Sequence, residues 1–385
     1  TPIKSSAASD VYKRQIFYYG VEINMDIGYV FWGAGSQGAL AADVFEACHS
    51  KDEGIYGYID NHRTGAFKGY GIVSCDSCTA HKLVITVDNS QLITDILSKA
   101  RNIGYEYIYW FTGVRNKETG NFLDDYCVDC SGWGSLILPQ AEIHVVDYCN
   151  LNCRGCTHFS PIFEKVLPDT AGRLKDIEIL KSKFSHIVKF FLLGGEPFLN
   201  PDINTYITET RRLLPDTMIQ IVTNGLLIPK LDAGILKTLH DNDIVVSISE
   251  YLPTHKIINQ IIRKLEENSI RYIIRSFDSK MVFNKPLSLA ADSKYEKKCI
   301  SNGCVNIWNG KIARCPTLMY IERFNKVFGT RLPDIGIYDL NELDGERILE
   351  IISETVPLCG HCVSNDIEWG RCGTTPELED FAERD

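Results

Sequence analysis

Short apolar runs separated by amphipathic stretches are the first feature of this chain. Four runs in its first third, DIGYVFW, GIYGYIDN, KLVITV and YEYIYWF, have the length and β-branched or aromatic content of buried strands. A helical pattern follows the first run, and another lies between the last two. Residues 25–121 are therefore predicted to form one small α/β domain.

A second, longer alternation of strands and helices begins near Glu142. The predicted strands are EIHVVDY, VKFFLLGGEP, MIQIVTNG, DIVVSISEY and IRYIIRSF, with amphipathic helices between them. About five strand–helix repeats predict a parallel barrel or partial barrel over residues 139–285. Residues 286–385 show little long periodicity but carry six cysteines, and we expect them to form a small separate domain.

Composition narrows the class of protein. Of the 385 residues, 44% are hydrophobic and 23% charged, as in globular proteins, and no apolar run approaches a membrane span. The net charge of −10 argues against nucleic acid as the main partner. No secretory signal is recognisable, so 14 mostly clustered cysteines indicate metal ligation in a reducing cytoplasm, without nucleic-acid or membrane partners.

The first residues are treated apart from the fold. The stretch DVYKRQ, residues 10–15, resembles the translated end of a transposase adapter used in sequencing libraries. We expect residues 1–24 to be a non-native leader or, alternatively, a disordered native terminus.

A glycine motif connects the first two predicted strands. Gly33, Gly35 and Gly38 give G-x-G-x-x-G after a strand and before a helix, and Asp60 ends the next strand. This order is typical of a dinucleotide-binding strand–helix–strand unit. The glycines would let a phosphate approach the helix N-terminus, and Asp60 would accept a ribose or sugar hydroxyl.

The same segment resembles the Rossmann-like N-terminal modules of some sugar-modifying enzymes. Those modules also read GAGSxG followed by a strand similar to GFIDN, as GAGSQG and GYIDN do here. A domain that has kept the fold and lost its ligand is the alternative, because fold alone does not establish function.

Three cysteines lie close together after the first strand of the second alternation. Cys149, Cys153 and Cys156 occur within the stretch DYCNLNCRGCTHFSP. Three thiols cannot all pair with one another, and a closed zinc site needs a fourth ligand that this loop lacks. Three thiolates suit an iron–sulfur cube that keeps one iron free, and a zinc knuckle is the alternative.

Further motifs follow the next three predicted strands. GGEP (194–197), TNG (223–225) and SISE (247–250) each come directly after an apolar run. Parallel barrels place their chemistry at these strand ends. A single motif of this kind is often only a turn, but four in one layer, with the cysteine loop, indicate a site.

C-x3-C-x2-C followed by GGEP and TNG resembles the radical S-adenosylmethionine superfamily over roughly residues 142–275. The resemblance implies a partial (β/α)6 barrel in which three thiolates hold a [4Fe–4S] cluster. Its fourth iron binds S-adenosylmethionine, and electron transfer then yields a 5′-deoxyadenosyl radical that abstracts a substrate hydrogen.

The resemblance also assigns residues by position. Cys149, Cys153 and Cys156 become cluster ligands, and the expected contacts of the S-adenosylmethionine are Gly194, Gly195, Glu196, Thr223, Asn224, Ser247 and Ser249. Many members carry an aromatic residue before the third cysteine, near the adenine. This chain has Gly155 there, so His158 or Phe159 would take that role, or the adenine would sit differently.

The C-terminal cysteines resemble the auxiliary-cluster domains of the SPASM and twitch type. Cys299 precedes Gly310 by ten residues, G-x4-C follows, and a CxxC pair comes later. The resemblance implies one auxiliary [4Fe–4S] cluster, with a zinc site as the alternative. The candidate ligands are Cys299, Cys304, Cys315, Cys359, Cys362 and Cys372.

Together these patterns predict a radical enzyme acting on a sugar or nucleotide-linked small molecule. A flavodoxin or ferredoxin is the expected reductant. Modification of a peptide or protein is the alternative, with the N-terminal module as a docking domain. A non-catalytic metal-binding protein is a further alternative, against which the intact GGEP and TNG motifs count.

Overall fold

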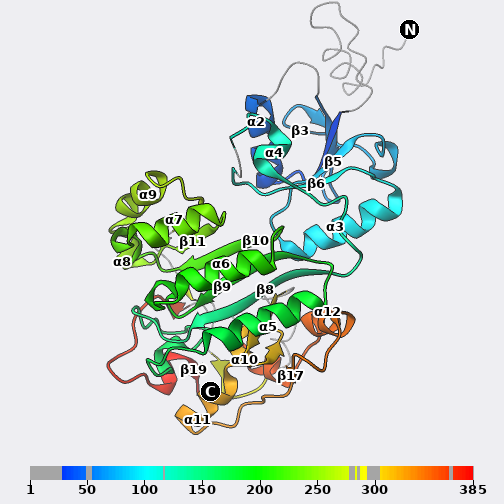
Figure 1. Cartoon of the computed structure of the whole chain (residues 1–385). Coiled ribbons are helices and arrows are strands. Elements are labelled where there is room, and N and C mark those ends of the chain that lie inside the picture. The colour runs from blue at the N-terminus through cyan, green and yellow to red at the C-terminus, as the bar shows by residue number, and fades with distance from the viewer. Residues whose placement is uncertain are drawn as a thin grey trace, which may run out of the picture. The chain divides into compact units, whose positions relative to one another are not determined.

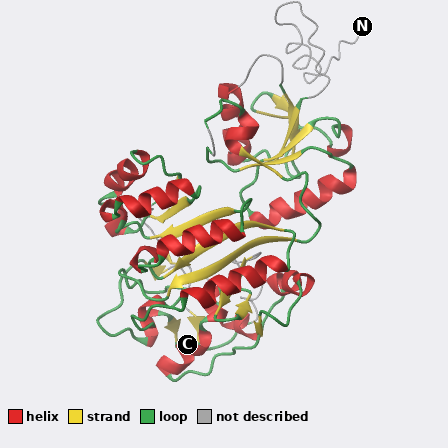
Figure 2. Cartoon of the chain, in the orientation of Figure 1, coloured by secondary structure: helices red, strands yellow, loops and turns green. Residues whose placement is uncertain are grey.

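The computed structural model describes residues 28–48, 54–115, 118–276, 282–283, 287–292, 304–363 and 367–384. The chain forms two compact units, residues 1–135 and 136–385. Both combine helices with parallel strands (Figure 2), which confirms the mixed α/β class predicted from the sequence. The predicted leader, residues 1–24, and Cys299 lie outside the described residues.

The first unit contains a five-stranded sheet in the order β2-β1-β5-β6-β7. The first four strands in this order are parallel, and β7 runs antiparallel to β6. The strands are β1 (Tyr29–Trp32), β2 (Ile55–Ile59), β5 (Lys82–Ile85), β6 (Ile108–Phe111) and β7 (Cys127–Asp129), and a small hairpin comprises β3 (Ala66–Phe67) and β4 (Tyr70–Gly71). The helices are α2 (Ser36–Cys48), α3 (Ser90–Ile103) and α4 (Phe122–Tyr126).

Close packing of a helix against a strand end explains one glycine of the motif. A Cβ at Gly38 would lie 2.0 Å from the Gly33 carbonyl oxygen, so α2 can start this close to β1 only with glycine there. β1 itself is buried along its whole length, and Phe31 and Phe45 pack edge to face inside the unit. The strand–helix–strand unit expected at this motif is present as β1, α2 and β2.

The second unit is built on an eight-stranded sheet in the order β12-β11-β10-β9-β8-β15-β16-β17. Six neighbouring strands, from β12 to β15, are parallel, and the sheet stays open (Figure 1). Its strands are β8 (Ile137–Val146), β9 (His186–Gly194), β10 (Met218–Thr223), β11 (Val245–Ser249), β12 (Tyr272–Arg275), β15 (Cys304–Trp308), β16 (Lys311–Ala313) and β17 (Ile337–Asp339).

Helices connect the parallel strands and cover one face of the sheet. In Figure 1, α5 and α6 lie across the strands β8 and β9. These connections are α5 (Thr170–Ser182), α6 (Ile203–Leu213), α7 (Ala233–Asp241), α8 (Leu252–His255) and α9 (Ile258–Glu266). Buried Ile, Leu, Val and Phe side chains of the strands and helices form one core. The burial of this apolar face stabilises the sheet and holds the strand ends in one layer.

The C-terminal residues continue the sheet as well as flanking it. β15 pairs in parallel with β8, Cys304 lying opposite Gln140, so the predicted division at residue 285 does not separate two sheets. The remaining helices are α10 (Pro316–Met319), α11 (Ile321–Phe328) and α12 (Gly345–Ser353). Two short pairings join β13 (Val282–Phe283) to β18 (Ile367–Glu368), and β14 (Leu287–Ser288) to β19 (Ala382–Glu383).

Within the part of the chain that the structure describes, no helix is long and apolar enough to cross a membrane.

Candidate active site

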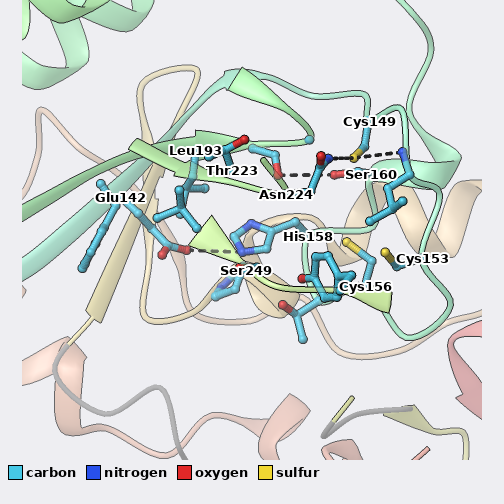
Figure 3. A pocket seen from close by; sticks show the side chains of 18 of the residues that line it. Glu142, Cys149, Cys153, Cys156, His158, Ser160, Leu193, Thr223, Asn224 and Ser249 are labelled. Carbon is cyan, nitrogen blue, oxygen red and sulfur yellow. Dashed lines mark hydrogen bonds and ion pairs between the residues drawn. The ribbon is translucent and has the colours of Figure 1, made fainter. Parts of the chain in front are cut away.

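A cavity of about 430 Å³ opens where β8, β9, β10 and β11 end. Cys149, Cys153 and Cys156 all line it, together with the ends of the following strands (Figure 3). In Figure 3 the three cysteines lie on one side of the cavity and Glu142 on the other. The three thiols that the sequence grouped on one loop therefore face one space.

The cysteine loop leaves β8 through a series of tight turns. Asn152, Gly155 and Phe159 adopt left-handed backbone conformations, with φ of 52°, 64° and 50°. Burial raises the pKa of the Cys149 thiol to about 12, and it raises the pKa of Cys153 and Cys156 as well. Buried thiols of this kind give up their protons to a metal, because only a cation compensates the buried negative charge.

The donor set suits an iron–sulfur cluster. Three thiols line one cavity, and polar groups line its opposite side. The space between them has room for a further ligand of a cluster held by the thiols. Among the described residues, no three His, Cys, Asp or Glu side chains converge on a single-metal site. An iron–sulfur cube does not require its ligands to converge on one metal ion, since each thiolate binds a different iron.

Gly194 and Gly195 bring the end of β9 against the start of the cysteine loop. A Cβ at Gly195 would lie 1.8 Å from the Tyr148 carbonyl oxygen, and one at Gly194 would lie 2.0 Å from that of Val146. The Gly195 N–H also donates to Val146 O at 2.9 Å. The two glycines thus hold the cysteine loop in place, and both line the cavity.

Glu196 does not line the cavity. Its side chain is fully buried and accepts hydrogen bonds from the Thr223 hydroxyl at 2.7 Å and the Asn224 N–H at 3.0 Å. Burial raises the pKa of this carboxyl to about 7, although these donors oppose the rise. The structure therefore places Glu196 as an anchor between two strand ends, whereas the sequence predicted a direct contact with the cofactor.

The loop after β10 reaches the first cysteine. The Asn224 side-chain amide donates to the Asn150 side chain at 2.8 Å and approaches Cys149 Sγ at 3.7 Å. Thr223 and Asn224, both predicted to contact the S-adenosylmethionine, line the cavity. Of the two serines predicted on β11, Ser249 lines the cavity, and Ser247 is buried and does not.

Two histidines, His144 and His158, form a hydrogen-bonded chain at the cavity. The rings of His144 and His158 are joined by an Nε2–Nδ1 contact of 2.8 Å, and His144 Nδ1 lies 3.0 Å from Asp147 Oδ1. Burial lowers the pKa of His144, while Asp147 opposes that shift. Burial would raise the pKa of Asp147, but His144 and Arg173 hold it below its ordinary value.

The other polar groups of the cavity come from β8, β12 and β15. His158 Nε2 lies 3.9 Å from Glu142 Oε1, and Gln140, Arg275 and Cys304 line the same space. The only sequence signal for this set is the alternation of residues 140, 142 and 144 on one face of β8. The loop that brings His158 over them has no comparable pattern.

Aromatic side chains near the cysteine loop are arranged differently from the expectation. Phe159 is 2% exposed and packs against Phe324 and Phe381, so it is not available to an adenine ring. His158 lines the cavity, and so does Tyr251, which follows β11. Tyr251 is a candidate that the sequence did not suggest.

The predicted auxiliary ligands fall into different places. Cys304 lies in β15 and lines the main cavity, and the Cys372 N–H donates to Asn152 O in the cysteine loop at 2.8 Å. Cys315 precedes α10, and Cys359 and Cys362 lie in or next to the 3₁₀ turn Pro357–His361. Cys315, Cys359 and Cys372 all pack against one apolar cluster of the second unit.

In the first unit, the glycine motif surrounds the start of α2. Asp60 Oδ2 accepts from the Ala34 N–H at 2.9 Å, and Oδ1 accepts from the His62 and Arg63 N–H groups. These backbone donors hold the pKa of Asp60 below its ordinary value, although its burial opposes them. Asp60 stabilises the glycine loop, whereas the sequence predicted an acceptor for a sugar hydroxyl.

Comparison with known proteins identifies part of the second unit. Residues 143–278 match the sequence model of the Radical SAM superfamily. This part of the chain is a radical SAM domain. The family implies a [4Fe–4S] cluster and S-adenosylmethionine.

Curated relatives of the radical SAM domain are enzymes. A S-adenosylmethionine-dependent nucleotide dehydratase of Flammeovirga pacifica is 28% identical over 185 residues, which are 43% of this chain and 62% of that protein. A GTP 3′,8-cyclase of Clostridium acetobutylicum is 30% identical over 26% of this chain and 31% of that protein. The chain thus spans less than two thirds of the length of either relative.

Solved structures with detectable likeness include BtrN in complex with AdoMet and 2-DOIA, at 17% identity and a TM-score of 0.39. That match covers 60% of this chain and 96% of BtrN. SuiB of Streptococcus suis, bound to its precursor peptide SuiA, matches at 12% identity and a TM-score of 0.32. It covers 57% of this chain and 66% of SuiB.

Proposed function

We propose that this chain cleaves S-adenosylmethionine reductively and uses the resulting 5′-deoxyadenosyl radical to abstract hydrogen from a sugar or nucleotide-linked small molecule. The observation that carries the proposal is that Cys149, Cys153 and Cys156 share one cavity with the GGEP and TNG strand ends. The cluster and S-adenosylmethionine would supply the radical chemistry, and the protein would position the reactants.

The chain's own residues would divide this work among them. Cys149, Cys153 and Cys156 would hold the cluster, and the backbone of Gly194 and Gly195 would meet the amino group of the cofactor. The hydroxyls and amides that line the cavity would take its remaining polar groups, namely Thr223, Asn224 and Ser249. Glu196 would act through Thr223 and Asn224, since its carboxylate bonds to both.

The polar wall opposite the cysteines supports a hydroxylated substrate. Glu142 and His158 offer acceptors that suit sugar hydroxyls, and Arg275 lines the cavity with a cation that suits a phosphate. Two curated relatives are named for nucleotide chemistry, which favours a nucleotide-linked substrate. The glycine loop of the first unit is in keeping with the same substrate class.

One auxiliary [4Fe–4S] cluster is part of the proposal. Its ligands would be Cys315, Cys359 and Cys362, with Cys299 as the fourth on the basis of sequence spacing alone. Cys304 and Cys372 are the further candidates: Cys304 lines the main cavity and interacts electrostatically with Cys315, and Cys372 packs against the same apolar cluster as Cys359. A flavodoxin or ferredoxin in the cytoplasm would supply the electron to the first cluster.

Anaerobic reconstitution tests the proposal. The full chain, loaded with iron and sulfide and given S-adenosylmethionine and dithionite, should release 5′-deoxyadenosine. The Cys149→Ala/Cys153→Ala/Cys156→Ala variant should lose about four irons per chain and release none. The variant Cys315→Ala/Cys359→Ala/Cys362→Ala should keep cofactor cleavage while losing the second set of irons.

Substrate class is tested by isotope transfer. Nucleotide-sugars carrying deuterium on the sugar ring should pass it to 5′-deoxyadenosine, detected by mass spectrometry. Transfer from a deuterated peptide and from none of the sugars would replace the small-molecule proposal with peptide modification. Unchanged cofactor cleavage by the first triple variant would overturn the assignment of the site itself.

A further inference from the structure

A C-terminal segment reaches back to the cysteine loop across more than 200 positions of sequence. The indole N–H of Trp369 donates a hydrogen bond to Cys153 Sγ at 3.2 Å. Cys153 is 8% exposed, so this sulfur is largely shielded from solvent. A donor aimed at one of three expected cluster ligands acts on the cluster that the ligand would hold.

Backbone contacts hold the segment in this position. Residues 370–372 run antiparallel to the loop, with a bridge between Cys153 and Arg371. Two backbone hydrogen bonds join the two stretches, Arg154 N to Gly370 O at 2.9 Å and Cys372 N to Asn152 O at 2.8 Å. A third, from Gly155 N to Asp380 O at 2.7 Å, ties the loop to a residue farther along the chain. The Arg154 guanidinium also pairs with Asp380 at 3.0 Å.

A ring contact fixes the indole itself. Trp369 stacks on Tyr251 with ring centroids 6.0 Å apart and an interplanar angle of 19°. Tyr251 follows β11 and lines the cavity, so the stack joins the C-terminal segment to the barrel strands. The backbone pairing with the cysteine loop and the stack on Tyr251 together hold the indole with its N–H directed at Cys153 Sγ.

We propose that Trp369 is a positioning residue that raises the reduction potential of the cluster on Cys149, Cys153 and Cys156. An N–H dipole directed at a thiolate sulfur stabilises the reduced cluster more than the oxidised one, because the reduced cluster carries the extra negative charge. Burial strengthens the effect, since little water competes at this sulfur. The inference rests on the cluster of the proposed function.

Substitution of Trp369 tests the inference. Trp369→Phe keeps an aromatic ring to stack on Tyr251 and removes the fused ring that carries the N–H. Redox titration of the full reconstituted chain, monitored by electron paramagnetic resonance, should show a more negative midpoint reduction potential for this variant than for wild type. The signal that belongs to the cluster is the one absent from the Cys149→Ala/Cys153→Ala/Cys156→Ala variant.

A second substitution in the same segment is the matched control. Phe381→Leu loosens the packing of the segment against Phe159 and Phe324 and leaves the indole N–H of Trp369 in place. It should leave the midpoint at the wild-type value. Equal shifts in Phe381→Leu and Trp369→Phe would overturn the inference, as would an unchanged midpoint in Trp369→Phe.

A measurement on the unaltered protein covers the case in which Trp369→Phe assembles poorly. With tryptophan labelled with ¹⁵N in the indole ring, the reduced cluster should show a ¹⁵N hyperfine coupling in pulsed resonance spectra. Absence of that coupling in wild type overturns the inference whatever the variant does. A chain that binds no iron at the loop overturns both proposals, whereas a cluster without the coupling overturns only this one.

Discussion

The hydroxyl of Thr223 donates a 2.7 Å hydrogen bond to the fully buried carboxyl group of Glu196. This contact joins Glu196, which follows Gly194 at the end of β9 and Gly195, to Thr223 at the end of β10. The two strand ends carry most of the expected cofactor contacts, so Glu196 sets their spacing without facing the cavity.

Glu196 should make stability depend on pH. Its pKa rises from 4.5 to about 7 on folding because burial disfavours the charge, so the folded chain binds the proton more tightly than the unfolded chain. Stability should therefore fall as pH rises from about 4.5 to 7, by at most about 3 kcal/mol. Urea unfolding at several pH values measures it.

Glu196→Gln should flatten this pH dependence, because the amide does not titrate. Glu209→Gln on α6, a partly exposed position paired with Arg212, is the matched control and should keep the wild-type slope. Identical slopes for wild type and Glu196→Gln would mean that the buried carboxyl is not the source.

Gly195 should tolerate no side chain. A Cβ there would meet the Tyr148 carbonyl oxygen at 1.8 Å and the Cys149 nitrogen at 2.8 Å, so Gly195→Ala must displace the cysteine loop. We expect a destabilisation of about 1–3 kcal/mol and a loss of iron after reconstitution. Gly373→Ala, whose Cβ would meet only an ordinary contact at 3.6 Å, should keep both stability and iron. Full iron in Gly195→Ala would contradict this role.

His144 should act on the substrate through His158. His144→Phe keeps an aromatic ring against Tyr320 but removes both hydrogen bonds, so His158 loses its fixed orientation toward Glu142. Deuterium transfer from substrate should fall on the order of tenfold, a typical cost of losing a supporting partner, while cofactor cleavage without substrate persists. His186→Phe, at the far end of β9 and outside the cavity, should change neither rate.

Much of the cavity was predictable because parallel strands end in one layer. Cys149, Gly194 and Thr223 each follow an apolar run, and the periodicity alone brings them together. Which residues of a strand reach the cavity was not predictable. Ser247 lies two residues before Ser249 on the same face of β11, but it is buried and does not line the cavity. The direction of Glu196, which leaves its strand at a turn, was likewise not encoded in the pattern.

Contacts between distant segments were the part that sequence reasoning missed. His158 reaches His144 because the cysteine loop turns back over β8, and the left-handed residues Asn152 and Gly155 give no local pattern for that path. The spacing of Cys372, a predicted ligand of the auxiliary cluster, likewise gave no sign that its backbone N–H donates to Asn152 O in the cysteine loop. Such placements depend on the packing of whole segments, which residue spacing does not specify.

The glycine loop of the first unit is the remaining test of substrate class. The Asp60 carboxylate accepts hydrogen bonds from three backbone N–H groups, so substitution of Asp60 would disturb the loop itself and is not a suitable probe of ligand binding. Asp60→Ala should instead lower the stability of the loop by about 1–3 kcal/mol, measured by thermal unfolding. Gly35 is the better probe, because a Cβ there would meet no atom within 4 Å.

Gly35→Val should therefore leave the fold intact and abolish binding of a nucleotide-sugar. The valine side chain would occupy open space beside the start of α2, where a diphosphate would meet backbone N–H groups. In the full wild-type chain, a nucleotide-sugar at a hundredfold excess over Kd should stabilise the folded state by about 2.7 kcal/mol, seen as a thermal shift. Gly71→Val, also directed into open space but on β4, should keep that shift. If no nucleotide, nucleotide-sugar or dinucleotide stabilises the wild-type chain, the first unit has kept the fold without the ligand, and its support for a nucleotide-linked substrate is lost.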